Sequence, residues 1–337
     1  MLSIKPLDKK ELGNNQAFFY NSNFMQSKFW AELKSDYGFK PLYFLLDNSK
    51  SIEVLSVLIR PIVGNYSIAY IPHGPSEEFI NNIKISEMSK ELKKYLPKGC
   101  LLIRFDLLVT KDCEIDLTSL KKSAVDIQVP DTTILDIDKP EEDLLKNMHK
   151  KTRYNIKLAK KKAVVISEVD STSIDRWYDM YKVTAKRDSI AIHSKDYYKS
   201  VYSKAKKSEN SDMRLLFAEH EGDLLAGIFV LISGNKATYL YGASSNNKRN
   251  LMPSYLLQWS AIKLAKSLGA TEYDFFGIPP SGDKGHPMHG LYRFKTGFGG
   301  RIVNRVGCYD YPLMLLSIPF RLLEVLRNYY YKKLKKA

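Results

Sequence analysis

The sequence predicts an α/β (α+β) protein made of two similar domains, each with a mixed sheet and flanking helices. The first observation is a repeated order of elements: a helix, three short strands, a second helix and a further strand occur twice along the chain. The second is length, because 337 residues exceed what one hydrophobic core usually serves. The third is composition, since 44% hydrophobic and 26% charged residues are ordinary for a globular chain.

The first set of elements occupies the N-terminal third of the chain. Short β-rich runs separated by turn residues indicate an antiparallel meander. Pro97 and Gly99 end the helix that follows, and an almost continuous apolar run then fits a strand covered on both faces. The predicted elements are a helix over 24–36, strands over 41–46, 52–60 and 66–71, a helix over 76–96 and a strand over 100–108.

The second set repeats this order after a basic bridge. Its meander-helix-strand order is that of the N-acyltransferase (GNAT-type) fold, an analogy that rests on order alone. We place the first domain at residues 1–137, completed by residues 303–337, and the second domain at residues 138–302. The predicted elements are a helix over 177–187, strands over 213–219, 224–232 and 236–243, a helix over 253–268 and a strand over 271–276.

The net charge of +15, from 52 Lys and Arg against 37 Asp and Glu, favours an anionic partner. Nucleic acid, a phosphorylated metabolite and an anionic membrane all qualify; a generally lysine-rich proteome is the alternative. The three cysteines form no CxxC motif, which is typical of a reduced, cytoplasmic chain. No secretory signal is visible, and no window reaches the ~18 apolar residues of a membrane-spanning helix.

The bridge over residues 138–163 predicts one basic helix. Asp138 can cap it, and Pro140 and Glu141 suit its first turn. One face is apolar, and the basic residues on the others have almost no acidic partners in helical spacing. They form either a solvated face or a contact with the phosphate backbone of a nucleic acid. The candidate phosphate contacts are Lys150, Lys151, Arg153, Lys157, Lys160 and Lys161.

The C-terminal segment from Tyr311 is apolar and then basic, ending in YKKLKKA. An amphipathic helix lying on an anionic leaflet accounts for this pattern. A helix packed on the first domain, followed by a basic tail, accounts for it equally well.

The glycine-rich stretch from Thr271 to Gly300 is the strongest candidate site. Long glycine-rich loops within compact domains are usually functional or disordered. Its two histidines, His286 and His289, have an H-x-x-H spacing but no acidic or thiol companions, so we expect no metal there.

The same stretch closes on a predicted strand that carries Lys295. With Phe294 and Tyr292 beside it, this cation suits a ligand that carries or develops negative charge. The alternative is a surface lysine on an edge strand. The chain has no GxSxG elbow and no phosphate-binding P-loop. The segment 246–253, where a GNAT domain would bind the pyrophosphate of coenzyme A, has basic residues but no glycine.

Three segments together carry a family resemblance: KNMHKKTRYNIKLAKKKAVVI, LYGASSNNKRNLMPSYLLQWSAIKLAKSLGATEYDFFGI and GLYRFKTGFGG. They resemble the Fem family, the FemABX-type peptidyltransferases that build peptidoglycan interpeptide bridges. The resemblance covers nearly the whole chain and is densest from Lys146 to Gly300. It implies two GNAT-like domains and transfer of an amino acid from aminoacyl-tRNA to an amine on the stem peptide of a cell-wall precursor. No cofactor is then expected, because aminoacyl-tRNA is the co-substrate.

The resemblance also implies roles for individual residues. Phe294 and Lys295 match the pair that binds the tRNA end, and Lys295 stabilises the oxyanion formed during aminolysis. Asp106 matches an acid that orients or deprotonates the attacking amine, although pairing with Arg104 or another base is the alternative. The basic bridge would then contact tRNA. The further residues assigned to substrate binding are Trp30, Lys34, Tyr241, Arg249, Tyr255 and Tyr292.

Two departures from the family concern the acceptor. Members that accept a soluble UDP-linked precursor use a lysine after the first-helix tryptophan and an arginine near the start of the second domain. Here Trp30 is followed by AELK, and residues 192–195 contain no arginine. These departures, with the C-terminal segment, favour a lipid-linked muramoyl peptide and a place on the inner face of the membrane.

The long coiled-coil arm of many family members is not expected, because no heptad run of that length lies between Ser171 and Asp212. Two other functions stay open. One is an acyl-CoA-dependent N-acyltransferase on the same fold, and the other is a non-catalytic protein that binds RNA or membranes.

Overall fold

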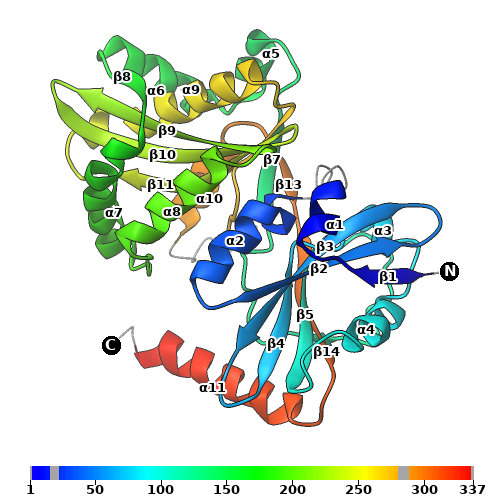
Figure 1. Ribbon diagram of the computed structural model, residues 1–337. Coiled ribbons are helices and arrows are strands. Elements are labelled where there is room, and N and C mark those ends of the chain that lie inside the picture. The colour runs from blue at the N-terminus through cyan, green and yellow to red at the C-terminus, as the bar shows by residue number, and fades with distance from the viewer. Residues whose placement is uncertain (1, 16–22, 280–287, 335–337) are drawn as a thin grey trace. The chain divides into compact units, whose positions relative to one another are not determined.

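The computed structural model describes residues 2–15, 23–279 and 288–334, and it divides into two compact units (Figure 1). The first unit ends at Pro130 and resumes at Asn304, and the second runs from Asp131 to Val303. The sequence placed the first boundary at residue 137. The difference arises because β7 (Thr132–Asp136) pairs with β12 and β13 of the second sheet. We call the two units the first and second domains.

The first domain has a seven-stranded sheet in the order β1-β2-β3-β4-β5-β14-β6. Strands β4 and β5 are parallel, and the other neighbours are antiparallel. The strands are β1 (Ser3–Pro6), β2 (Lys40–Asp47), β3 (Ile52–Pro61), β4 (Ser67–Pro72), β5 (Cys100–Thr110), β6 (Lys121–Lys122) and β14 (Arg305–Pro312). The helices are α1 (Lys9–Asn14), η2 (Phe24–Gln26), α2 (Lys28–Asp36), α3 (Glu77–Ile80), α4 (Ile85–Lys93) and α11 (Ser317–Leu334).

The second domain repeats this plan in the order β8-β9-β10-β11-β12-β7-β13, with β11 and β12 as its parallel pair. Its strands are β7, β8 (Val165–Val169), β9 (Ser211–His220), β10 (Asp223–Ser233), β11 (Lys236–Ser244), β12 (Glu272–Asp274) and β13 (Arg301–Val303). Its helices are α5 (Glu141–Asn147), α6 (Lys150–Lys161), η3 (Ser171–Ser173), α7 (Ile174–Asp188), α8 (Lys195–Lys206), η4 (Arg249–Leu251), α9 (Pro253–Ser267) and α10 (His289–Thr296).

The repeated plan confirms the predicted fold of two GNAT-like domains with mixed sheets. In each sheet the fifth strand, β5 or β12, is parallel to the fourth and antiparallel to a sixth strand from a distant part of the chain. That sixth strand is β14 in the first domain and β7 in the second. The region from 171 to 212 holds η3, α7 and α8 and no coiled-coil arm, as expected.

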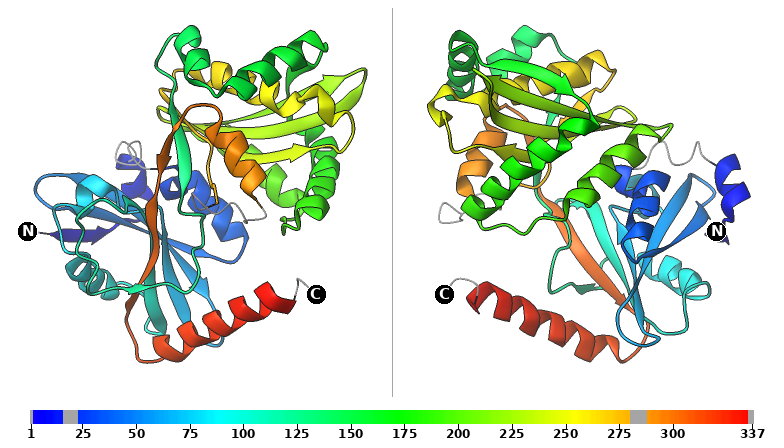
Figure 2. Two further views of the ribbon diagram at one scale, coloured as in Figure 1. Left: turned by 180° about the vertical axis from the view of Figure 1, so that it is seen from behind. Right: turned by 60° about the vertical axis from the view of Figure 1, so that its left-hand side comes forward.

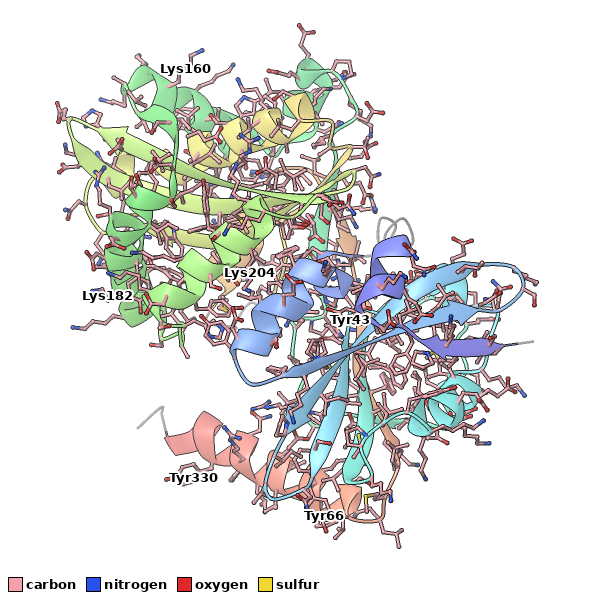
Figure 3. All side chains as sticks on the ribbon, viewed as in Figure 1. Tyr43, Tyr66, Lys160, Lys182, Lys204 and Tyr330 are labelled. Atoms are coloured by element: carbon pink, nitrogen blue, oxygen red, sulfur yellow. The ribbon has the colours of Figure 1, made fainter. Side chains whose placement is uncertain are left out.

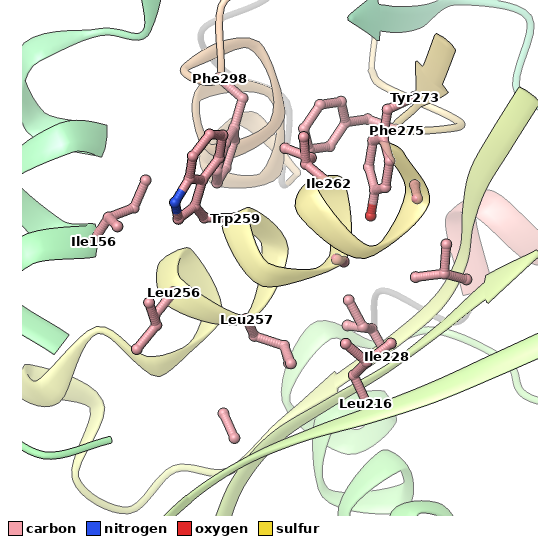
Figure 4. Close-up of a cluster of buried hydrophobic side chains, with 14 of the residues drawn as sticks. Ile156, Leu216, Ile228, Leu256, Leu257, Trp259, Ile262, Tyr273, Phe275 and Phe298 are labelled. Atoms are coloured by element: carbon pink, nitrogen blue, oxygen red, sulfur yellow. The ribbon is translucent and has the colours of Figure 1, made fainter. Parts of the chain in front are cut away.

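Each domain has its own apolar core. In the second domain, α9 supplies Leu257, Trp259 and Ile262, which pack with Tyr273 and Phe275 beside β12 (Figure 4). Ile156 of α6 joins the same cluster, so the apolar face predicted for the basic bridge is buried as expected. In the first domain, Phe79 of α3 and Met88 of α4 pack on inward side chains of the sheet.

Three predicted helices are interrupted. The first breaks at Ser27, whose Oγ caps α2 by accepting a hydrogen bond from Trp30 N. The second divides into α3 and α4. The basic bridge divides into α5 and α6 at Met148 and His149, and α5 begins after Pro140 rather than at a cap on Asp138.

The strand predicted around residues 291–295 is wrong, because α10 occupies this region. Leu291, Phe294, Lys295 and Phe298 follow the i, i+3, i+4, i+7 spacing of a helical face. Lys295 and Phe298 on this face are buried, and Leu291 and Phe294 are half-buried. The helical spacing of these residues therefore predicts the observed helix, whereas the aromatic residues of the region had favoured a strand.

Candidate functional site

Lys295 of α10 is a buried amine held by backbone carbonyls of the second domain. Only 6% of its surface is exposed. Its Nζ donates to the carbonyl oxygens of Phe276 at 2.5 Å and Gly277 at 2.9 Å. The ring of Tyr239 on β11 lies 5.2 Å from Nζ, within the range of a cation–π contact. The alternative of a surface lysine on an edge strand is therefore wrong.

The turn that presents these carbonyls is organised by Asp274 at the end of β12. Asp274 is 2% exposed, and its Oδ1 accepts from Phe276 N at 2.8 Å and from the Thr132 hydroxyl at 2.5 Å. Phe276 has a φ of +52°, a left-handed conformation that costs of order 1–3 kcal/mol for a residue with a side chain. These hydrogen bonds hold the strained turn and direct both carbonyls at Lys295.

The charge of Lys295 is balanced by opposing effects. Burial lowers its pKa to about 7, and the negative charge of Asp274 acts in the opposite direction. An amine with this pKa exchanges its proton readily at neutral pH. It can therefore stabilise negative charge as an ammonium group or pass a proton to an adjacent oxygen.

Phe294, which precedes Lys295 in α10, and Tyr255, both predicted to bind substrate, lie together on the apolar core of the second domain. Their rings are 5.0 Å apart in an edge-to-face arrangement, and Phe298 lies 5.5 Å from Phe294. Both are partly buried. Tyr292 is half-buried on another side of α10 and stacks on His289 with ring centres 6.0 Å apart.

Tyr241 and Arg249 lie in other parts of the second domain. The Tyr241 ring packs on Tyr198 at 5.0 Å and Phe229 at 6.1 Å, within an aromatic cluster around Trp177. Burial raises the pKa of Tyr241 well above its ordinary value. Arg249 is exposed on η4. The structure thus places Phe294 and Tyr255 together on the apolar core beside α10, and Tyr241 in the aromatic cluster around Trp177.

Asp106 on β5 is the buried acid of the first domain, with 2% of its surface exposed. It accepts from the Tyr70 hydroxyl at 2.9 Å and from Gln128 N at 3.3 Å. Burial raises its pKa to about 6. The alternative of a pair with Arg104 is wrong, because Arg104 binds Asp310 at 2.7 Å and Glu324 at 2.6 Å.

Trp30 and Lys34 lie on α2 of the first domain. Trp30 is 4% exposed and packs edge-on against Phe24, with ring centres 5.1 Å apart. The Nζ of Lys34 lies 4.6 Å from the Trp30 ring, and burial lowers the pKa of Lys34 to about 8. The structure thus assigns Trp30 to the core and makes it the platform on which Lys34 rests.

The basic residues of α6 divide into two groups. Lys150, Lys151, Lys157, Lys160 and Lys161 are exposed, and Lys160 projects from the helix in Figure 3. Arg153 is only partly exposed. Its Nη1 donates to the carbonyl oxygens of Lys146, at 2.9 Å, and Met148, so it closes the C-terminus of α5.

The sequence prediction missed Asp274, Thr132 and the carbonyls of the turn. The segment DFFG, an acid at a strand end followed by aromatics and glycine, was the available signal. Among the described residues, no group of three or more His, Cys, Asp or Glu is arranged to hold a metal ion. His286 lies outside the described residues.

Comparison with known proteins gives three consistent results. The model of the FemAB family matches residues 7–116, 111–219 and 203–322. The lipid II:glycine glycyltransferase of Staphylococcus aureus strain MRSA252 is 24% identical over 374 residues, covering 87% of this chain and 89% of the relative. The relative of strain NCTC 8325 gives the same identity and coverage.

Among solved structures, the crystal structure of FemX is similar with a TM-score of 0.80 and 21% identity, over 95% of this chain and 99% of FemX. The structure of L-PGS from Bacillus licheniformis has a TM-score of 0.55 and 12% identity, over 95% of this chain and 98% of that one. At these identities the structures show the fold.

The fold and the matched relatives define a class: this chain is an acyl- or aminoacyltransferase built from two GNAT-like domains. Within that class, the family model covers most of the chain from residue 7 to residue 322. The chain belongs to the FemAB family. Among the described residues, no helix is long and apolar enough to cross a bilayer.

Proposed function

We propose that this chain transfers an amino acid from aminoacyl-tRNA to an amine on the stem peptide of a lipid-linked peptidoglycan precursor. The observation that carries the proposal is Lys295, a buried amine fixed between two carbonyls and an aromatic ring. Membership of the FemAB family supports it, as do relatives named lipid II:glycine glycyltransferase. No metal or organic cofactor is required by this reaction.

The chemistry is aminolysis of an ester. The acceptor amine attacks the ester carbonyl carbon, a C–N bond forms, and the carbonyl oxygen becomes an oxyanion. The C–O bond to the ribose then breaks, the amine loses a proton and the ribose hydroxyl gains one. The ammonium of Lys295 is suited to stabilise the oxyanion, because a fixed donor in a water-poor site needs little reorganisation.

Asp106 is proposed to act on the acceptor amine. A carboxyl group with a pKa of about 6 is mostly ionised at pH 7. It can hold an ammonium group or accept its proton, and the neutral amine is the nucleophile. Its hydrogen bonds with Tyr70 and Gln128 N fix the carboxylate.

The exposed lysines of α6 are proposed to contact the tRNA backbone. Five of them lie on a helix of 12 residues. Each phosphate contact releases bound counterions, so affinity should fall steeply with salt. Arg153 is not assigned this role here, because its guanidinium binds carbonyls at the end of α5.

A donor comparison tests the proposal. Purified chain is incubated with lipid-linked precursor and either a pool of tRNA charged with labelled amino acids or labelled acetyl-CoA. We expect labelled precursor from charged tRNA only, and none after RNase treatment. Labelling from acetyl-CoA without tRNA would instead establish the acyl-CoA-dependent function. A parallel reaction with a soluble UDP-linked precursor should give weaker labelling.

A further inference from the structure

Helix α11 attaches to the first domain through polar side chains. Glu324 Oε2 accepts from Arg104 Nη2 at 2.6 Å, and Arg321 Nε donates to Asp310 Oδ2 at 3.2 Å. Arg321 Nη2 also donates to the Lys122 carbonyl at 2.8 Å. Arg104 and Asp310 are 2% and 0% exposed, so the polar face of α11 is fixed to a buried ionic cluster. Breaking such a cluster is costly, which holds the helix in one orientation.

The opposite face of α11 is apolar and uncovered. Ile318, Leu322, Leu323, Leu326, Tyr329 and Tyr330 have between 56% and 64% of their surfaces exposed. No side chain from the described part of α11 belongs to an apolar core cluster of the first domain. Figures 1 and 2 show α11 along one side of this domain with no other element of the domain over its far side.

This arrangement is the reverse of an ordinary surface helix, which buries its apolar stripe. Between Ile318 and Tyr330, all described, Arg327 is the one charged side chain that is exposed, whereas Arg321 and Glu324 are half-buried. A continuous apolar surface of this kind marks an interaction site. The ion pairs on the polar face determine which side of the helix is presented.

Basic groups lie on elements next to α11 and follow it in the sequence. Lys93 Nζ reaches the Leu313 carbonyl at the start of the segment, at 3.5 Å. Lys121 and Lys122 lie on β6, which Arg321 of α11 contacts. The sequence after Tyr330 is YKKLKKA, and the whole chain carries a net charge of +15. An uncovered apolar face on a strongly basic chain complements an anionic lipid leaflet. Two copies of this face would instead bring like charges together.

We propose that α11 is a membrane-docking helix whose outward apolar face lies in the interfacial layer of an anionic leaflet. The proposal rests on the proposed function in one respect, since a lipid-linked acceptor requires the enzyme to work at that surface. The Arg104, Asp310 and Glu324 cluster acts as the clamp that keeps the apolar face outward.

Vesicle binding tests the proposal with the full chain. Binding is measured to phosphatidylcholine vesicles with and without phosphatidylglycerol, for the native protein and for Leu323→Ser combined with Leu326→Ser. The matched control combines Val165→Ser and Val183→Ser, two exposed apolar positions of the second domain. Thermal unfolding of all three proteins verifies folding. We expect the native protein and the control to bind anionic vesicles, and the α11 variant to bind roughly tenfold more weakly or worse.

Three results would overturn the proposal. One is equal vesicle binding by the native protein and the α11 variant. Another is native binding to neutral vesicles as strong as to anionic ones. The third is a native dimer without vesicle affinity that the α11 variant converts to a monomer, which would assign the face to a second copy. Transfer to detergent-solubilised precursor is measured separately and should be unaffected in the α11 variant. A native protein that docks but transfers nothing would refute the proposed function alone.

Discussion

Each domain carries a buried aspartate on the fifth strand of its sheet, in contact with the sixth strand, yet the two have different surroundings. Asp106 on β5 lies opposite Cys308 of β14 and accepts from a tyrosine hydroxyl and a backbone amide. Asp274 on β12 accepts from Thr132 of β7 and from Phe276 N, within the turn that binds Lys295. The corresponding strands of a duplicated fold thus each carry a buried aspartate, with different hydrogen-bond partners.

The two aspartates differ in the charge nearby, because Asp274 lies close enough to Lys295 to affect its pKa. Burial is the largest cause of the raised pKa of Asp106, and its hydrogen bonds act in the opposite direction, so Asp106 can exchange a proton near neutrality. Asp274 opposes the effect of burial on Lys295 and organises the strained turn. We interpret Asp106 as a proton-exchanging acid and Asp274 as a positioning residue for the lysine.

The largest effect is expected for Lys295→Met, which removes the charge from the second-domain site and keeps its volume. Loss of one fixed donor to an oxyanion lowers kcat by about 10²–10³-fold. Lys207→Met, on an exposed lysine, is the matched control and should leave kcat unchanged. Initial rates of labelled transfer give both values. A Lys295→Met enzyme within twofold of native would remove Lys295 from the chemistry.

Asp106→Asn should lower kcat/KM by roughly 10²-fold, the lower end of general acid–base contributions. The native rate should rise with pH through about 6, as Asp106 ionises, and fall above about 7, as Lys295 loses its proton. The pH–rate profile of the Asp106→Asn variant should lack the rise near pH 6. A pH–rate profile of both enzymes measures this, and an unchanged limb would assign it to another group.

Asp274→Asn should change the alkaline limb of the pH–rate profile. Because Asp274 raises the pKa of Lys295, its loss should shift the alkaline limb of the pH–rate profile to lower pH. Activity at pH 7 should then fall more than activity at pH 6. A uniform loss at every pH would show that Asp274 acts on structure alone.

Asp106→Asn should lower activity but raise the stability of the fold at neutral pH. Its folded pKa of about 6 lies above the unfolded value near 4, so the folded state loses stability relative to the unfolded state as pH rises from about 4 to 6. Asp106→Asn should therefore stabilise the fold by up to about 3 kcal/mol at pH 7, and by almost nothing below pH 4. Urea unfolding at both pH values measures the gain. A variant less stable than native at pH 7 would contradict this account.

The smallest effects compare the two supporting hydroxyls. Tyr70→Phe removes a hydrogen bond to Asp106, and Thr132→Val removes one to Asp274. Each should cost about 1–3 kcal/mol of folding free energy, the usual value for a bond to a charged group. Only Tyr70→Phe should raise the pKa near 6 in the pH–rate profile, because only that hydroxyl stabilises ionised Asp106. A similar shift in both variants would show that the two sites are not independent.

Much of the fold was predictable from periodicity and turn residues. The two meanders and the helix that begins at Pro253 follow strong local signals, and the structure agrees with them. The breaks at Ser27 and after Met148 were missed because capping bonds interrupt otherwise helical patterns. The place of β7 depends on pairing with strands far away in the chain, which no local pattern encodes.

For the site, the family resemblance and the aromatic setting of Lys295 led to the prediction of Lys295 and Asp106, but their surroundings required the structure. Asp274 was not selected, because its role depends on a turn conformation at Phe276 and on Thr132, which is distant in sequence. For Trp30 and Arg153, which the sequence predicts to bind substrate and tRNA, the structure adds contacts within the fold: Trp30 packs on Phe24, and Arg153 binds carbonyls at the end of α5.

A single-turnover measurement tests the central claim most directly. Native enzyme in excess over labelled aminoacyl-tRNA, with saturating lipid-linked precursor, isolates the chemical step from binding and release. We expect rapid RNase-sensitive appearance of labelled precursor with native enzyme, and a chemical step slowed by at least about 10²-fold with Lys295→Met. No labelled precursor from charged tRNA, or an equal rate for the two enzymes, would contradict it.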